Sequence, residues 1–253
     1  MIKTARQRMV SAARLGKFLA PMLILYALAF LYPMGSFGSL YHALVKKGYN
    51  AANTYSVDIY VYVVTPAYFL FALYLILMAV LAKRFYKLSD KDIGWTAPQR
   101  PWKILAAIGI TPVFYAFQAA CFILQMRLHL HHWIGYPPHP NIVFRRPGDP
   151  ANWLDFAFIV LLSPLAEEIL DRGVVQTLLK IKLGRGPAVA ATAILFVLAH
   201  LAYRAGAIYH NPWLLLNYLE GGLFFGILKE WDGSLWSPIL AHQVFNLIGL
   251  RFG

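Results

Sequence analysis

Long apolar runs separated by short polar stretches make up most of the chain. Most of these runs approach the roughly 20 residues that an α-helix needs to cross the hydrocarbon core of a bilayer. They extend over about Phe18 to Tyr32, Asp58 to Leu81, Ile104 to Met126, Trp153 to Leu179, Ala188 to Ala207, Trp213 to Leu228 and Leu235 to Leu250. The sixth run is short and glycine-rich, so a re-entrant segment is its alternative. The pattern predicts an all-α, polytopic transmembrane helix bundle with about seven spans.

Composition and charge support a membrane protein. Of the 253 residues, 59% are hydrophobic and 13% are charged, against about 25% charged residues in soluble domains. The formal net charge of +12 at first suggests a nucleic-acid partner. However, the cations gather between the apolar runs and form no stripe on a soluble face, so we expect contact with membrane lipids and no nucleic acid.

The distribution of Lys and Arg also predicts the orientation. The first 17 residues are basic and contain no Asp or Glu, and residues 82–103, between the second and third runs, are rich in Lys and Arg. Since cytoplasmic segments carry the excess of Lys and Arg, the N-terminus is expected in the cytoplasm and the C-terminus outside. We predict an integral, multi-pass protein, in the plasma (inner) membrane if the source is bacterial.

The fourth run carries charged residues at mid-membrane depth. Glu167, Glu168, Asp171 and Arg172 interrupt a segment that is otherwise mostly apolar. Each charge at that depth costs roughly 3 kcal/mol on insertion scales, so some of these residues are expected to be functional. Arg172 follows Glu168 by four residues and can pair with it on one helix face. Such a pair also fits a purely structural role, and Asp171 is assigned no role.

Two later runs each carry a histidine near their middle. His200 and His242 lie at a depth comparable to Glu167, which is about 20 Å along its own helix. Phe196 precedes His200 by four residues and Asn246 follows His242 by four, so each pair shares a helix face. A lone buried histidine is usually a packed core residue. A glutamate pair and two histidines at one depth favour a functional site instead.

Other polar residues are better explained without function. Glu220, beside two glycines in the sixth run, fits packing as well as it fits an ion pair with Arg204 or a water path. A second histidine cluster suggests a metal, but its aromatic and proline neighbours favour an interfacial loop. This cluster contains His129, His131, His132 and His139.

The three polar motifs together resemble a known family. The pattern Glu167-Glu168-x-x-x-Arg172, then Phe196-x-x-x-His200, then His242-x-x-x-Asn246 is similar to that of the CPBP family of intramembrane proteases. This family includes the type II CAAX-prenyl endopeptidases and the Abi, or bacteriocin-immunity, proteins. The resemblance covers about Trp153 to Leu250. It divides the chain into residues 1–152, a basic segment with three unassigned helices, and residues 153–253, a protease-like core.

The resemblance implies an intramembrane endopeptidase that hydrolyses a peptide bond in a membrane-associated or lipid-proximal protein. It implies that Glu167 with His200 activates a water, and that His242 and Asn246 stabilise the oxyanion. Glu168 and Arg172 would form a supporting ion pair, with Phe196 as a further supporting residue.

A metal is the alternative to direct activation of the water by a glutamate. Glu167, His200 and His242 with a water also form a catalytic zinc set, although the chain lacks His-Glu-x-x-His spacing. The residues leave both mechanisms open.

Two other classes of function use the same residues. In a non-catalytic immunity or scaffold protein, the polar cluster would be a packing network. In a proton-coupled transporter, the glutamate and histidines would relay protons, although the internal repeat common in transporters is not visible. The sequence does not select a substrate, and the resemblance permits both prenylated and unprenylated proteins.

Overall fold

The computed structural model describes residues 16–17, 20–24, 26–27, 65–98, 100–127, 153, 156–210 and 214–252. Within these ranges the chain is helical and contains no β-strand, as expected for an all-α protein. The first predicted run is only partly included, and the start of the second lies outside the described residues. The cluster of His129, His131, His132 and His139 also lies outside them.

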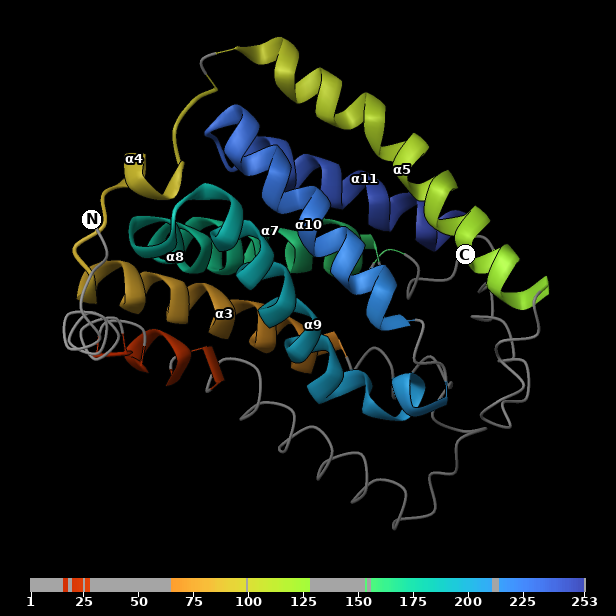
Figure 1. The fold of residues 1–253 in the computed structure, drawn as a ribbon, viewed down its shortest axis with the longest axis horizontal. Helices are drawn as coiled ribbons and strands as arrows, with labels where there is room; N and C mark the ends of the chain where they lie inside the picture. Colours follow the sequence, from red (N-terminus) through yellow and green to blue (C-terminus); the bar gives the residue numbers. More distant parts are fainter. Residues whose placement is uncertain are drawn as a thin grey trace, which may run out of the picture.

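The described helices follow the predicted apolar runs, with their ends shifted by a few residues. Figure 1 shows α3 along one side of the molecule and α5 along another, with the remaining long helices between them. The elements in chain order are α3 (Thr65–Phe85), α4 (Asp90–Ile93), α5 (Pro101–Arg127), η3 (Phe156–Leu162), α7 (Ser163–Glu168), η4 (Ile169–Val175), α8 (Gln176–Leu183), α9 (Arg185–His210), α10 (Leu214–Asp232) and α11 (Trp236–Phe252).

The connection between α3 and α5 is ordered by the short helix α4. Ser89 caps this helix, since its hydroxyl accepts from the Asp92 backbone N–H while its own N–H donates to the Asp92 carboxylate. Hydrogen bonds from the side chain and backbone of Ser89 hold the pKa of Asp92 below its usual value. Gly94 ends the helix with a φ of 78°, and its carbonyl accepts from the Leu235 N–H at 2.9 Å. This connection is therefore attached to the start of α11.

The fourth apolar run differs from the single α-helix that its hydropathy predicts. It alternates between π-helical and α-helical turns, as η3, α7, η4 and α8. Pro164 lies at the first change of register and has no N–H to donate. In the π-helical pattern its partner would be the carbonyl five residues earlier, at Ile159. That carbonyl instead accepts from the Asn246 side chain on α11, at 2.9 Å.

Buried apolar side chains form two clusters on either side of the charged residues of the fourth run. The larger cluster lies among α3, the fourth run and the start of α9, and includes Leu75 and Leu178. The smaller cluster joins α5, α10 and α11 through Ala107, Phe225 and Ala241. The charged residues therefore lie between two apolar cores.

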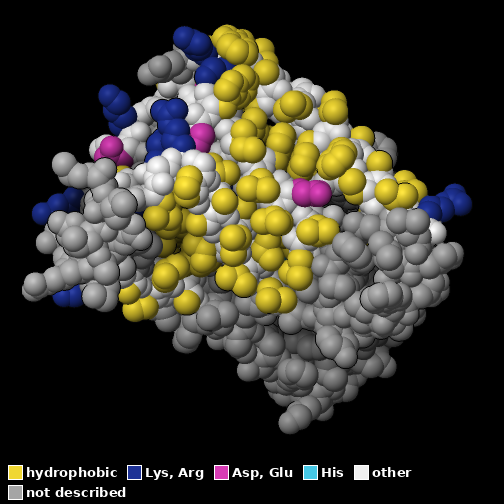
Figure 2. Space-filling view, viewed as in Figure 1, with side chains coloured by type: hydrophobic (Ala, Val, Ile, Leu, Met, Phe, Trp, Pro, Cys, Tyr) yellow, Lys and Arg dark blue, Asp and Glu magenta, His cyan; other side chains and the backbone are white. Residues whose placement is uncertain are grey.

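The surface is rich in apolar side chains. Figure 2 shows them covering most of the described surface on one face, with the Lys and Arg side chains towards the edges. Leu70, Leu105 and Val113 are each about two-thirds exposed, which is typical of surfaces that contact lipid. Among the described helices, only one segment, Pro101–Leu124 in α5, is both long and apolar enough to cross a bilayer. The count of seven spans and the orientation therefore stay predictions.

The helices α9 and α10 make a close backbone contact near the middle of α10. A Cβ atom added at Gly222 would lie 2.9 Å from the Ala193 Cα atom, closer than non-bonded carbon atoms approach. The neighbouring Gly221 has more room, because the nearest atom to its Cβ position is a Phe225 ring carbon at 3.8 Å. Glycine at 222 therefore sets the separation of the two helices.

We expect Gly222→Ala to lower the free energy of unfolding by about 1–3 kcal/mol, because the added methyl group pushes α9 and α10 apart. Gly221→Ala, the matched control, is expected to be neutral or slightly stabilising, since alanine favours helix. Thermal unfolding of the purified protein in detergent measures both. Equal effects of the two changes would contradict the close contact.

Candidate active site

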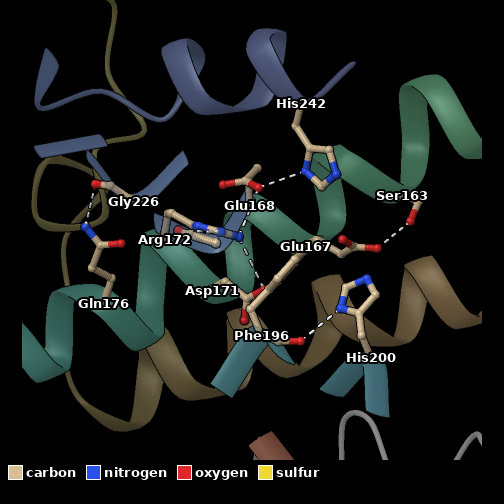
Figure 3. Close-up of polar contacts among 11 residues, drawn as sticks. Ser163, Glu167, Glu168, Asp171, Arg172, Gln176, Phe196, His200, Gly226 and His242 are labelled. Carbon is tan, nitrogen blue, oxygen red and sulfur yellow. Dashed lines mark hydrogen bonds and ion pairs between the residues drawn. The ribbon is translucent and has the colours of Figure 1, made fainter. Parts of the chain in front are cut away.

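The glutamate and the two histidines that the sequence singles out lie together in the fold. Figure 3 shows Glu167 from α7 between His200 from α9 and His242 from α11. Each of the three side chains belongs to a residue that is only 6–7% exposed. Three helices therefore bring one carboxylate and two imidazoles to a site that is nearly closed but still touches the surface.

Glu168 contacts both Arg172 and His242 in the interior of the protein. Its Oε1 atom accepts from Arg172 Nη1 at 3.0 Å and lies 2.9 Å from His242 Nδ1. The side chains of Glu168 and Arg172 are both 0% exposed, so this ion pair is fully removed from solvent. A carboxylate at Nδ1 makes that nitrogen the hydrogen-bond donor of His242 and turns Nε2 towards the site.

Arg172 links the fourth run to two other helices. Its Nη2 atom donates to the Gly222 carbonyl of α10 at 3.2 Å. The guanidinium carbon lies 4.8 Å from the centre of the Phe196 ring and 5.6 Å from that of Phe225, distances typical of cation–π contacts. Asp171, which was assigned no role, is also fully buried, with Oδ2 at 3.5 Å from Arg172 Nη1. The arginine thus lies close to both Glu168 and Asp171 and also binds the backbone of α10.

His200 is held by its own helix and by two aromatic rings. Its Nδ1 atom lies 2.9 Å from the Phe196 carbonyl oxygen. Since a carbonyl only accepts, Nδ1 carries the proton, and in neutral His200 the Nε2 atom is an acceptor. The Phe196 and Tyr218 rings lie 4.3 and 4.2 Å from the imidazole centre. This packing fixes the plane of the histidine ring.

His242 is held in a similar way by rings from two helices. The Phe225 ring of α10 stacks on it with centres 4.4 Å apart, and the Phe196 ring of α9 lies edge-on at 6.4 Å. Phe196 therefore contacts both histidines and the guanidinium of Arg172. Its role as a supporting residue of the site stays a prediction.

Glu167 and Asn246 are oriented by residues of the fourth run. The Ser163 hydroxyl donates to Glu167 Oε1 at 2.6 Å. Asn246, one turn after His242, donates through Nδ2 to the Ile159 carbonyl, and its second amide hydrogen stays available. Asn246 thus lies beside the fourth run and carries a contact that spacing alone does not predict.

The donor atoms do not form a metal site. Within the part of the chain that the structure describes, no three His, Cys, Asp or Glu side chains lie close enough together to hold a metal ion. We therefore derive no step through a metal, and the zinc set of Glu167, His200 and His242 stays a prediction.

Three residues at the site escape sequence reasoning. Ser163 lies four residues before Glu167, so helical spacing alone would have placed the two on one face. Tyr218 and Phe225 come from α10, whose apolar run contains several aromatic residues, and no periodic signal separates these two from the others. The depth of a residue along its helix does not identify them, because ring stacking depends on the rotation of α10 about its axis. The side chain of Arg204, the suggested partner of Glu220, lies outside the described residues.

Comparisons with known proteins support the resemblance over this region. Residues 149–248 match the family model described as "Type II CAAX prenyl endopeptidase Rce1-like", which confirms the resemblance to the CPBP family for that part of the chain. The matched family is one of membrane-embedded endopeptidases that act on peptide substrates.

One curated protein from Bacillus subtilis (strain 168), "Uncharacterized protein YpbD", is 32% identical over 92 residues, which are 36% of this chain and 41% of that protein. The chain thus matches less than half the length of this relative. No solved structure matches the chain.

We expect Arg172→Met to destabilise the protein by about 3–5 kcal/mol, because it leaves the buried Glu168 carboxylate without its cation. The matched control is Lys180→Met, which breaks a pair with Glu230 at 2.7 Å whose lysine is 40% exposed. For that change we expect about 0–1 kcal/mol. Unfolding in detergent with a chemical denaturant compares the two, and a similar loss in both would contradict a dominant buried pair.

Proposed function

We propose that this protein is an intramembrane endopeptidase that hydrolyses a peptide bond in a membrane-associated protein, with a water activated by Glu167 and His200. The arrangement of one carboxylate and two imidazoles from three helices carries the proposal. Peptide hydrolysis needs a base for the water, a donor for the oxyanion and a proton for the leaving amine. The described residues supply candidates for all three needs.

Glu167 and His200 are the candidates for the base. The carboxylate of Glu167 accepts a proton from the water, and the resulting hydroxide adds to the scissile carbonyl carbon. The Nε2 atom of His200 accepts a second hydrogen bond from the same water, because its Nδ1 proton is engaged by the Phe196 carbonyl. Two acceptors orient the water more closely than one does. The proton held by Glu167 then passes to the leaving amine.

His242 and Asn246 are the candidates for oxyanion stabilisation. In its doubly protonated form His242 donates Nε2–H to the oxyanion, while Glu168 accepts from Nδ1 and balances the positive charge. Asn246 contributes the amide hydrogen that the Ile159 carbonyl does not take. Donors fixed before the reaction stabilise developing charge without reorganising, and one such donor changes kcat by about 10²–10³-fold.

The nearly closed position of the site favours a membrane-embedded substrate over a soluble one. Glu167, His200 and His242 are each only 6–7% exposed, and the face of the molecule in Figure 2 is rich in apolar side chains. A substrate segment near a lipid anchor or a transmembrane helix would reach such a site from the bilayer. The name of the matched family includes a prenylated substrate, so a prenylated C-terminal segment is the first substrate class to test.

We expect Glu167→Ala to abolish the formation of new protein termini in cells that express the protein. Membrane and secreted fractions of cells that carry the wild type or the variant at equal expression would be compared by mass spectrometry. Termini that occur only with the wild type would identify the substrates. Glu167→Gln should behave like Glu167→Ala, since an amide cannot take the proton of the water.

Glu230→Gln is the matched control, because Glu230 belongs to a separate group of contacts with Lys180 and Gln176. This variant should give the wild-type termini. If the termini are identical in the wild type and in Glu167→Ala, the protein is not a protease, and a scaffold or immunity function takes its place. A proton-coupled transporter would show the same identical termini but would lose transport with Glu167→Gln.

A further inference from the structure

We propose that Ser163 is a positioning residue that holds Glu167 in the orientation needed to activate the water. The inference rests on the proposed function, because it assigns Ser163 a role in the same reaction. No part of the motif resemblance includes Ser163, and its hydroxyl is not expected to contact the substrate. The proposal depends on one hydrogen bond and on the reason why the serine is free to make it.

The hydrogen bond fixes one of the two carboxylate oxygens of Glu167. Ser163 Oγ donates to Oε1 at 2.6 Å, a short distance that is typical of hydroxyl donors on a carboxylate. The hydrogen bond described for the Glu167 carboxylate is to Oε1, which leaves Oε2 as the oxygen to accept from the water. A carboxylate with one oxygen held and the other open has one preferred direction in which to accept a proton, and Figure 3 shows it between the two histidines.

A serine within a helix commonly makes a different bond. Its hydroxyl tends to donate back to the backbone carbonyl four residues earlier, which for Ser163 is the carbonyl of Ile159. That carbonyl already accepts from Asn246 Nδ2 at 2.9 Å. Asn246 therefore competes with Ser163 for the carbonyl, and the Ser163 hydroxyl turns forward to Glu167.

The two bonds couple Asn246 to Glu167 through the fourth run. Asn246 donates to the Ile159 carbonyl, Ser163 donates to Glu167, and Pro164, next to Ser163, has no backbone N–H to offer this carbonyl. Loss of the Asn246 amide would free the carbonyl for Ser163 and so release Glu167. Asn246 would thus influence the base as well as the oxyanion.

The first experiment measures cleavage by the full chain in lipid nanodiscs. The reporter is a peptide that spans a junction found in the comparison of termini. Ser163→Ala should lower kcat about 10- to 100-fold and leave KM within about twofold. A loss of this size corresponds to the free energy that a hydrogen bond to a charged group contributes. Ser163→Thr keeps the hydroxyl and should restore most of the rate.

Ser237→Ala is the matched control, because it removes another serine donor to a carboxylate, 2.7 Å from Asp232, at the far end of α10. This variant should keep the wild-type kcat. The double variant Ser163→Ala/Asn246→Ala should be less impaired than the product of the two single effects predicts, since Asn246 acts partly through Ser163.

A second experiment does not depend on proteolysis. Dicyclohexylcarbodiimide reacts with carboxyl groups in apolar surroundings, and mass spectrometry of the peptides locates the label on Glu167. Ser163→Ala should label faster than the wild type, and Ser163→Thr should label at the wild-type rate. Equal labelling in all three would overturn the proposed contact, whether or not a substrate is found.

The outcomes separate this inference from the proposed function. Cleavage that survives Glu167→Ala ends the proposed function, while the labelling rates still decide the Ser163 contact. Cleavage that is lost with Glu167→Ala but unchanged with Ser163→Ala overturns the positioning role alone. A third outcome is that Ser163→Ala abolishes cleavage as completely as Glu167→Ala does. If a fluorophosphonate then labels Ser163 in the wild type, the serine is a nucleophile, and this overturns the positioning role as well.

Discussion

The fully buried ion pair between Glu168 and Arg172 is the constraint on which the rest of the site depends. An isolated charge in such surroundings is strongly unfavourable, and each member of the pair offsets the cost of burying the other. Once paired, Arg172 binds the Gly222 carbonyl and lies against two aromatic rings, while Glu168 binds His242. The pair therefore fixes the fourth run, α9, α10 and α11 relative to one another before any catalytic group is considered.

Much of this arrangement could be predicted from spacing along the chain. Apolar runs interrupted by glycine, proline and charged residues gave helices whose ends differ from the structure by a few residues. The Glu168–Arg172 pair and the shared faces of Phe196 with His200 follow from helical geometry, because residues four apart lie one above the other. The common depth of Glu167, His200 and His242 was predicted because each lies near the middle of an apolar run.

The remaining features depend on information that spacing does not contain. Hydropathy does not distinguish an α-turn from a π-turn, so the π-helical stretches η3 and η4 on either side of the glutamates were not predicted. Which rings of α10 contact the histidines depends on the rotation of that helix, which is set by the close approach at Gly222. The number of spans depends on the first 64 residues, of which the structure describes only a small part.

Pro164 and Asn246 have a joint consequence for the evolution of such chains. The proline has no N–H with which to reach the Ile159 carbonyl, and the asparagine, 82 positions away, donates to that carbonyl through its side chain. A chain that lost only the asparagine would leave this carbonyl to the Ser163 hydroxyl, and one that lost only the proline would offer it a further donor. The two positions are therefore coupled through this carbonyl, and we expect them to vary together among homologues.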